Sequence, residues 1–200
     1  HPDKPLLFDK RDGEWKGKNW QEVSDAVQRI SAALLSFGIE RGDRVLIASE
    51  NRSEWAISEL AIMAVGAISV PAYTTYTEDD HHYVMEHAGA KLAFVSGGQI
   101  AHRVTSAARR APSITDIVVF NPAQDLGDTG TIKTHDFDAL LAEFAPLDEM
   151  QSYVDAIETD DTACFIYTSG TGGRPKGVML THRNIQSNVT AAIELLSEAD

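Results

Sequence analysis

The residues from Thr168 to Lys176 have the types and the spacing of a loop that holds phosphate groups. This nine-residue segment contains three glycines, three hydroxyl side chains and two cations. Glycine lets the backbone curl so that successive N–H groups point inward, hydroxyls donate beside them, and Arg174 and Lys176 add positive charge. The segment therefore predicts a polyphosphate-binding loop, which is a basic spot in a chain of net charge −13.

Three well-known loops do not fit the segment. In the P-loop of kinases and NTPases a glycine precedes the lysine, but Pro175 stands there, and an apolar run at 178–180 follows before any helix. The dinucleotide-binding fingerprint lacks its third glycine at the same proline. The nucleophile elbow of hydrolases fails because Tyr167, not glycine, lies two residues before Ser169. A P-loop kinase or NTPase stays open as a second enzyme hypothesis, and a helix starting directly at Gly177 would favour it.

Apolar segments border this loop and must position it. Residues 162–167 are expected to form a buried strand before the loop, and residues 178–180 a second strand after it. Thr181 is expected to cap a following helix. The apolar positions of that helix fall on one face: Ile185, Val189, Ile193 and Leu196.

The rest of the chain alternates strands with helices. A hairpin over 6–18 is followed by a helix that begins at the capping box of Asn19 and Glu22 and ends at Gly38. Strands are then expected at 45–48, 68–73, 91–96 and 116–120. The helices between them are expected to start at a Ser53 cap, at 77–80 and at Gln99. This order predicts an α/β fold with a mostly parallel, helix-covered β-sheet built from βαβ units.

The stretch from 121 to 161 interrupts this alternation. Residues 121–130 are rich in Pro, Gly, Asp and Gln and are expected to form a surface loop. Residues 135–144 are expected to form a short helix, and residues 146–161 are acidic without a firm pattern. A subdomain boundary is therefore predicted near 121–161.

Composition excludes several classes of protein. The 200 residues are 43% hydrophobic and 24% charged, which is typical of a globular chain and not of a disordered one. The acidic balance argues against nucleic acid as a partner. The single cysteine, Cys164, excludes a disulfide framework and fits a reducing compartment. No stretch is typical of a membrane span or a secretory signal, so a cytoplasmic location is predicted and peripheral membrane contact stays open.

Histidines gather between residues 81 and 87 and raise the question of a metal site. His82 and Glu86 are four residues apart and share a helix face, whereas His81 and His87 point elsewhere. We therefore interpret this cluster as a solvated helix face rather than as a metal centre.

The twelve residues from Tyr167 to Val178 resemble the signature phosphate loop of the adenylate-forming (AMP-binding) superfamily. That superfamily includes acyl- and aryl-CoA synthetases, peptide-synthetase adenylation domains and luciferases. Gly172 departs from the usual threonine and removes one hydroxyl donor. Four earlier segments, 19–23, 42–45, 51–55 and 66–71, and the helix start at 181–185 resemble the family in the same order, so the resemblance covers nearly the whole chain. The segment from Val70 to Val95 is most similar to long-chain fatty acyl-CoA synthetases.

The resemblance implies a fold, an activity and a set of site residues. Residues 1–200 would be the amino-terminal portion of the AMP-binding large domain, and the carboxy-terminal remainder, with its catalytic lysine, would be absent. The enzyme would activate a carboxylate with Mg-ATP as an acyl-adenylate and then form the coenzyme A thioester, so its partners would be ATP, Mg²⁺, coenzyme A and a fatty acid. Thr168 would touch magnesium. The residues that would cradle the phosphates are Thr168, Ser169, Gly170, Thr171, Gly172, Gly173 and Lys176.

The same resemblance leaves alternatives open. Because the acyl pocket and the carboxy-terminal lysine would be missing, these 200 residues are expected to be inactive alone. Their affinity for ATP is expected to be weak, because the family's contacts with the base and the ribose lie in other segments. An aryl-CoA ligase and a carrier-protein adenylation domain stay open as alternative enzymes. A non-enzymatic nucleotide-binding module is the alternative from another class.

Overall fold

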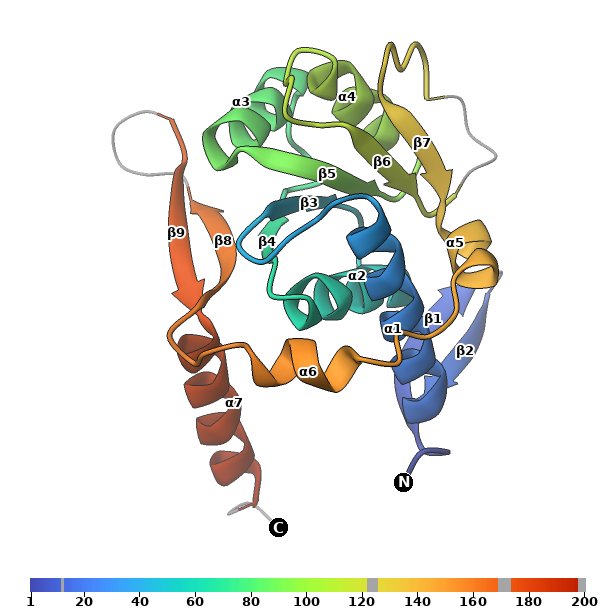
Figure 1. The fold of residues 1–200 in the computed structure, drawn as a ribbon, viewed down its shortest axis with the longest axis vertical. Coiled ribbons are helices and arrows are strands. Elements are labelled where there is room, and N and C mark those ends of the chain that lie inside the picture. Colours follow the sequence, from blue (N-terminus) through green and yellow to red (C-terminus); the bar gives the residue numbers. More distant parts are fainter. Residues whose placement is uncertain (12, 122–125, 169–173, 198–200) are drawn as a thin grey trace.

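A computed structural model describes residues 1–11, 13–121, 126–168 and 174–197 (Figure 1). In this described part, seven strands form one sheet in the order β7-β6-β5-β3-β4-β8-β9. Neighbouring strands are parallel, except that β8 and β9 form an antiparallel pair at one edge. Their bounds are β3 Arg44–Ala48, β4 Ile68–Pro71, β5 Ala90–Val95, β6 Asp116–Val119, β7 Lys133–Asp136, β8 Thr162–Thr168 and β9 Lys176–Thr181. The predicted α/β class with a mostly parallel sheet is confirmed.

Helices cover both faces of the sheet (Figure 1). Helices α3 (Glu78–Ala88) and α4 (Gly98–Ala108) lie on one face. Helices α1 (Trp20–Ser36), α2 (Ser53–Ala64) and α5 (Phe137–Glu143) lie on the other. Outside these layers are the hairpin of β1 (Pro5–Arg11) and β2 (Glu14–Asn19), the short α6 (Met150–Asp155) beside α2, and α7 (His182–Ser197) after β9.

The central strands are buried on both faces, which explains their continuous apolar runs. In β3, Leu46 and Ala48 pack under α3 and α4, whereas Val45 and Ile47 pack under α1 and α2. The four side chains are all fully buried. The side chains alternate between the two layers because strand residues point to opposite faces of a sheet.

The helix ends follow the predicted capping with one exception. Asn19 Oδ1 accepts a hydrogen bond from the Glu22 N–H at 2.8 Å, and the Glu22 carboxylate accepts from the Asn19 N–H at 2.7 Å, as a capping box requires. Ser53, however, does not cap α2. It is the first helical residue, and the carboxylate of Asp9 accepts from its N–H at 2.8 Å. The hairpin thus supplies an acceptor for one of the N–H groups in the first turn of α2 that have no partner within the helix.

The short helix expected at 135–144 begins two residues late, because its start belongs to the strand β7. β7 pairs with β6, and His135 stacks on Phe37 with ring centroids 4.3 Å apart. His135 Nε2 also lies 2.8 Å from a carboxylate oxygen of Asp116. This polar edge strand is thus held by contacts with distant residues, in the stretch where the sequence predicted a subdomain boundary. α5 also joins the core through Phe137, which is 1% exposed.

Candidate phosphate-loop site

The ends of the predicted phosphate loop face each other across an antiparallel strand pair. Thr168 is the last residue of β8 and pairs in register with Lys176, the first residue of β9, and both are exposed. β8 runs parallel to β4, with Cys164 opposite Ser69, and its last residues lie beside α3 (Figure 1). The other predicted phosphate-binding residues, Ser169, Gly170, Thr171, Gly172 and Gly173, lie outside the described residues.

Helix α3 supports this strand pair from one face of the sheet. The Tyr167 hydroxyl lies 2.8 Å from His87 Nδ1, and burial raises the pKa of Tyr167 to about 12, so this phenol stays protonated. Gly177 lies opposite Tyr167, where an added Cβ would come within 3.2 Å of the ring. A larger residue there would require the Tyr167 ring to shift by a few tenths of an ångström. No local sequence pattern predicts this support, because His87 and Tyr167 are 80 residues apart.

The predicted solvated face on α3 holds for Glu86 and His87, which are exposed, and is wrong for His81. His81 is completely buried and its ring lies edge-on to Tyr76, with centroids 5.7 Å apart. Burial, aided by the charge of Arg103, lowers the pKa of His81 to about 4, so the imidazole is neutral at pH 7. His82 and Glu86 do form the expected pair, 3.3 Å apart. Within the described residues no group of three His, Cys, Asp or Glu side chains could hold a metal ion.

A buried polar cluster lies where β8 joins the parallel strands. Ser69 of β4 pairs in register with Cys164 of β8, and the Ser69 hydroxyl donates to the Glu59 carboxylate of α2. Burial raises the pKa of Glu59 from its ordinary 4.5 to about 6, although the serine hydrogen bond opposes the shift. Burial and the charge of Glu59 raise the pKa of Cys164 to about 11, so this thiol is unreactive at neutral pH, as its 4% exposure also indicates.

We expect Glu59 to make the unfolding free energy of the protein dependent on pH. The raised pKa means that the folded chain binds this proton more tightly than the unfolded chain does. Protonated Glu59 therefore stabilises the folded chain fully below pH 4.5, and this stabilisation is lost as the pH rises through about 6. The stabilisation amounts to about 2 kcal/mol of unfolding free energy.

Urea unfolding of wild type and Glu59→Gln between pH 4.5 and 7.5 measures this effect. The difference between the two proteins should change by about 2 kcal/mol across that range. Glu143→Gln, at an exposed position of α5, should show no such change. Parallel pH profiles for wild type and Glu59→Gln would contradict the assignment.

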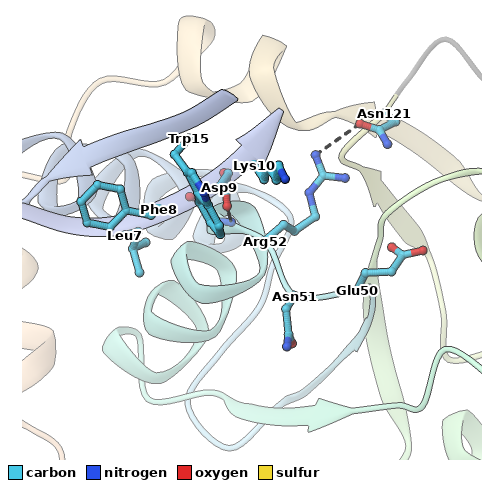
Figure 2. Close-up of a pocket in the computed structure, with 10 residues that line it drawn as sticks. Leu7, Phe8, Asp9, Lys10, Trp15, Glu50, Asn51, Arg52 and Asn121 are labelled. Carbon is cyan, nitrogen blue, oxygen red and sulfur yellow. Dashed lines mark hydrogen bonds between the residues drawn. The ribbon is translucent and has the colours of Figure 1, made fainter. Parts of the chain in front are cut away.

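A cavity of about 740 Å³ lies between the β1-β2 hairpin and the carboxyl ends of β3 and β6 (Figure 2). Phe8 and Trp15 of the hairpin line one side, and the turn after β3 lines the other. Arg52 in that turn lies 2.8 Å from the Glu54 carboxylate and donates to Asn121 Oδ1 at 3.2 Å. The sequence did not predict this cavity, because its walls come from three separate parts of the chain.

A second cavity, of about 410 Å³, adjoins the first and shares Glu50 and Asn121 with it. It lies over the start of α4, with Ser96 and Arg103 among its lining residues. Arg103 donates to the carbonyls of Thr74 and Tyr76 at 3.1 and 2.9 Å, and so fixes the turn after β4. Together, the two cavities hollow the molecule between the β1-β2 hairpin, the turn after β3 and the start of α4.

No helix in the described residues is both long and apolar enough to cross a membrane.

Comparison with curated proteins relates the chain to CoA ligases. It is 32% identical over 183 residues to a long-chain-fatty-acid–CoA ligase of Mycobacterium tuberculosis, an alignment that covers 90% of this chain and 29% of that protein. It is 30% identical over 193 residues to fatty acyl-CoA synthetase A of Dictyostelium discoideum, covering 94% of this chain and 28% of that protein. The chain thus spans less than a third of the length of these curated relatives.

Solved structures share the fold. The anthranilate CoA ligase AuaEII, in complex with anthranoyl-AMP, superposes with a TM-score of 0.74 at 22% identity over 91% of this chain and 32% of that one. The sequence model of the family described as AMP-binding enzyme matches residues 1–199. The chain, which already resembled this family in its loop, therefore belongs to the AMP-binding enzymes.

Proposed function

We propose that the protein acts as an ATP-dependent acyl-CoA synthetase that converts a fatty acid, through an acyl-adenylate, to its coenzyme A thioester. The observation that carries this proposal is the pairing of exposed Thr168 and Lys176 at the ends of the phosphate loop in a chain of the AMP-binding family. A carboxylate is a poor electrophile until one of its oxygens becomes part of a good leaving group. Adenylation provides this group when the carboxylate attacks the α-phosphate and pyrophosphate departs.

The loop residues would act on the departing pyrophosphate. Negative charge grows on the pyrophosphate formed by the β- and γ-phosphates as the bond between the α-phosphorus and the bridging oxygen breaks, and fixed donors stabilise that charge without reorganising. We assign this role to Thr168, to residues 169–173 and to Lys176. The ammonium group of Lys176 supplies a full positive charge, and the hydroxyl of Thr168 supplies a donor opposite it in register. The second step, attack of the coenzyme A thiol on the acyl carbonyl, releases AMP.

The residues present fit a magnesium ion that arrives with the nucleotide. Mg²⁺ prefers oxygen ligands and often combines one or two protein ligands with phosphate oxygens and water. The Thr168 hydroxyl is such an oxygen at the loop end. The described residues contain no cluster of three His, Cys, Asp or Glu side chains that would bind the ion without the nucleotide. The bound ion would neutralise charge on the phosphates.

We further propose that these residues are the amino-terminal portion of a longer AMP-binding domain. The support is that the curated relatives are more than three times as long as the matched segment. The 200 residues alone would then bind phosphate but not complete adenylation. A cytoplasmic location stays a prediction.

ATP–pyrophosphate exchange tests the proposal. Both the 200-residue chain and the longest natural polypeptide that contains it would be assayed with fatty acids of graded length, with benzoate and with no acid. We expect exchange from the longer polypeptide, strongest with long-chain acids, and none from the 200 residues. Robust exchange by the 200 residues would contradict the assignment of these residues as an incomplete domain.

The same assay separates the alternatives. Preference for benzoate or anthranilate would indicate an aryl-CoA ligase, the activity named for AuaEII. Exchange without formation of a coenzyme A thioester would indicate a carrier-protein adenylation domain. Nucleotide binding without exchange in any polypeptide would indicate the non-enzymatic module and overturn the ligase proposal.

A further inference from the structure

Tyr83 of α3 contacts two consecutive residues at the start of the described segment after the loop. The guanidinium carbon of Arg174 lies 5.1 Å from the centroid of the Tyr83 ring, within the range of a cation–π interaction. The Tyr83 hydroxyl donates to the carbonyl of Pro175 at 2.9 Å. One side chain thus fixes the backbone at Pro175 through its hydroxyl and the side chain of Arg174 through its face.

The ring of Tyr83 is itself held in place. It is partly buried and packs edge-on against Tyr167, with centroids 6.4 Å apart, and lies tilted against His87 at 5.3 Å. His87 and Tyr167 are joined to each other by their 2.8 Å hydrogen bond. These aromatic residues connect α3 with both β8 and the start of β9. A side chain constrained in this way loses little freedom when it orients a neighbour.

Arg174 remains available to an anion. Its side chain is exposed, whereas Arg52 and Arg183 are paired with carboxylates. Within the described residues no carboxylate pairs with Arg174, and its guanidinium contacts the face of Tyr83. A cation–π contact with one ring leaves the guanidinium N–H groups that face away from the ring free to donate. Two residues further on, the exposed Lys176 provides a second cation.

We propose that Tyr83 is a positioning residue that presents the Arg174 guanidinium, two residues before Lys176, to the polyphosphate chain of a nucleotide. This inference rests on the proposed function and adds to it a second cationic ligand and the residue that orients it. A planar guanidinium can donate two parallel hydrogen bonds to one phosphate, which a point charge such as lysine does not match. The described residues that follow the loop therefore combine one oriented guanidinium group, from Arg174, with one ammonium group, from Lys176.

Titration of the 200-residue chain with inorganic tripolyphosphate tests this inference without requiring catalysis. Isothermal titration calorimetry measures the binding. Arg174→Gln should weaken binding about tenfold, the size of one charge-assisted hydrogen bond. Tyr83→Leu should weaken it by a similar factor. The double variant should be little weaker than either single one, because both changes remove the same interaction. Arg109→Gln removes an equal charge from an exposed arginine paired with Asp128, and should leave binding nearly unchanged.

Conservative variants keep the inference falsifiable if Tyr83→Leu does not fold. Tyr83→Trp keeps an aromatic face, so Arg174 should stay oriented and affinity should fall less than threefold. In the polypeptide that shows exchange, Arg174→Gln should raise the KM for ATP and leave the KM for the acid unchanged. A general structural defect would alter both.

The outcomes separate this inference from the proposed function. If Arg174→Gln binds tripolyphosphate as well as Arg109→Gln does, and exchange activity is present, Arg174 is not a ligand and only the inference falls. If Arg174→Gln weakens binding but Tyr83→Leu folds and does not, Arg174 acts without Tyr83, and the positioning role falls. If no polypeptide shows exchange and wild type does not bind tripolyphosphate, the proposed function and the inference fall together.

Discussion

Replacing Lys176 by methionine should lower the rate of ATP–pyrophosphate exchange by about 100- to 1,000-fold, the loss typical of removing one donor from a site of growing charge. Methionine keeps much of the aliphatic length of lysine and removes the ammonium group. The lysine is exposed at the first position of β9, so its loss should change the unfolding free energy by less than about 0.5 kcal/mol. The exchange assay on the longer polypeptide and urea unfolding measure the two effects.

Two further variants show whether charge at this position is what matters. Lys133→Met removes an exposed lysine from β7, at the opposite edge of the sheet, and should leave exchange unchanged. Lys176→Arg keeps the charge on a bulkier group and should retain more activity than Lys176→Met. If Lys176→Met and Lys133→Met exchanged pyrophosphate at the same rate, the assignment of Lys176 to the phosphate site would be wrong.

Local signals in the sequence predicted most of the fold. Capping boxes at Asn19 and Thr77 and a left-handed glycine at Gly89 mark helix ends, and these devices act within a few residues of each other. The apolar runs of β3 and β5 identified buried strands because both faces of a covered parallel sheet are apolar. Where the signal is local, prediction and structure agree.

Features that depend on distant partners could not be predicted in this way. β7 is a polar strand that forms because β6 offers it backbone partners and Phe37 offers His135 a ring to stack on. The first N–H of α2 is satisfied by Asp9, 44 residues earlier, instead of by a local cap. Periodicity and propensity carry no information on such pairs.

The candidate site also has one part that the sequence could predict and one part that it could not. The pairing of Thr168 with Lys176 follows from two apolar runs around a glycine-rich segment, so the sequence could predict that a loop lies between two strands. Which helix supports the loop could not be predicted. Tyr83 and His87 lie on a helix of polar composition whose histidines we interpreted as a solvated face. Their contacts with Pro175 and Tyr167 arise only because β4 and β8 are neighbours in the sheet.

Replacing Gly89 by alanine should destabilise the protein by about 3 kcal/mol, because two penalties act at one position. Gly89 ends α3 with φ at +62°, a conformation that costs about 1–2 kcal/mol for a residue with a Cβ. The new Cβ would also lie 2.6 Å from Arg44 Nη2. Arg44 donates to the carbonyls of Ala88 and Gly89 at 2.6 and 2.8 Å, so moving it leaves carbonyls at this helix end without a donor.

Gly38→Ala is the matched control for this prediction. Gly38 follows α1 with φ at +77°, and an added Cβ there meets nothing within 4 Å, so the variant should show only the conformational penalty of about 1–2 kcal/mol. Urea unfolding of the two variants measures the difference. Equal losses would mean that Arg44 moves aside without cost. A larger loss for Gly89→Ala would show that the Arg44 contacts fix the end of α3, the helix from which Tyr83 and His87 reach the strands around the phosphate loop.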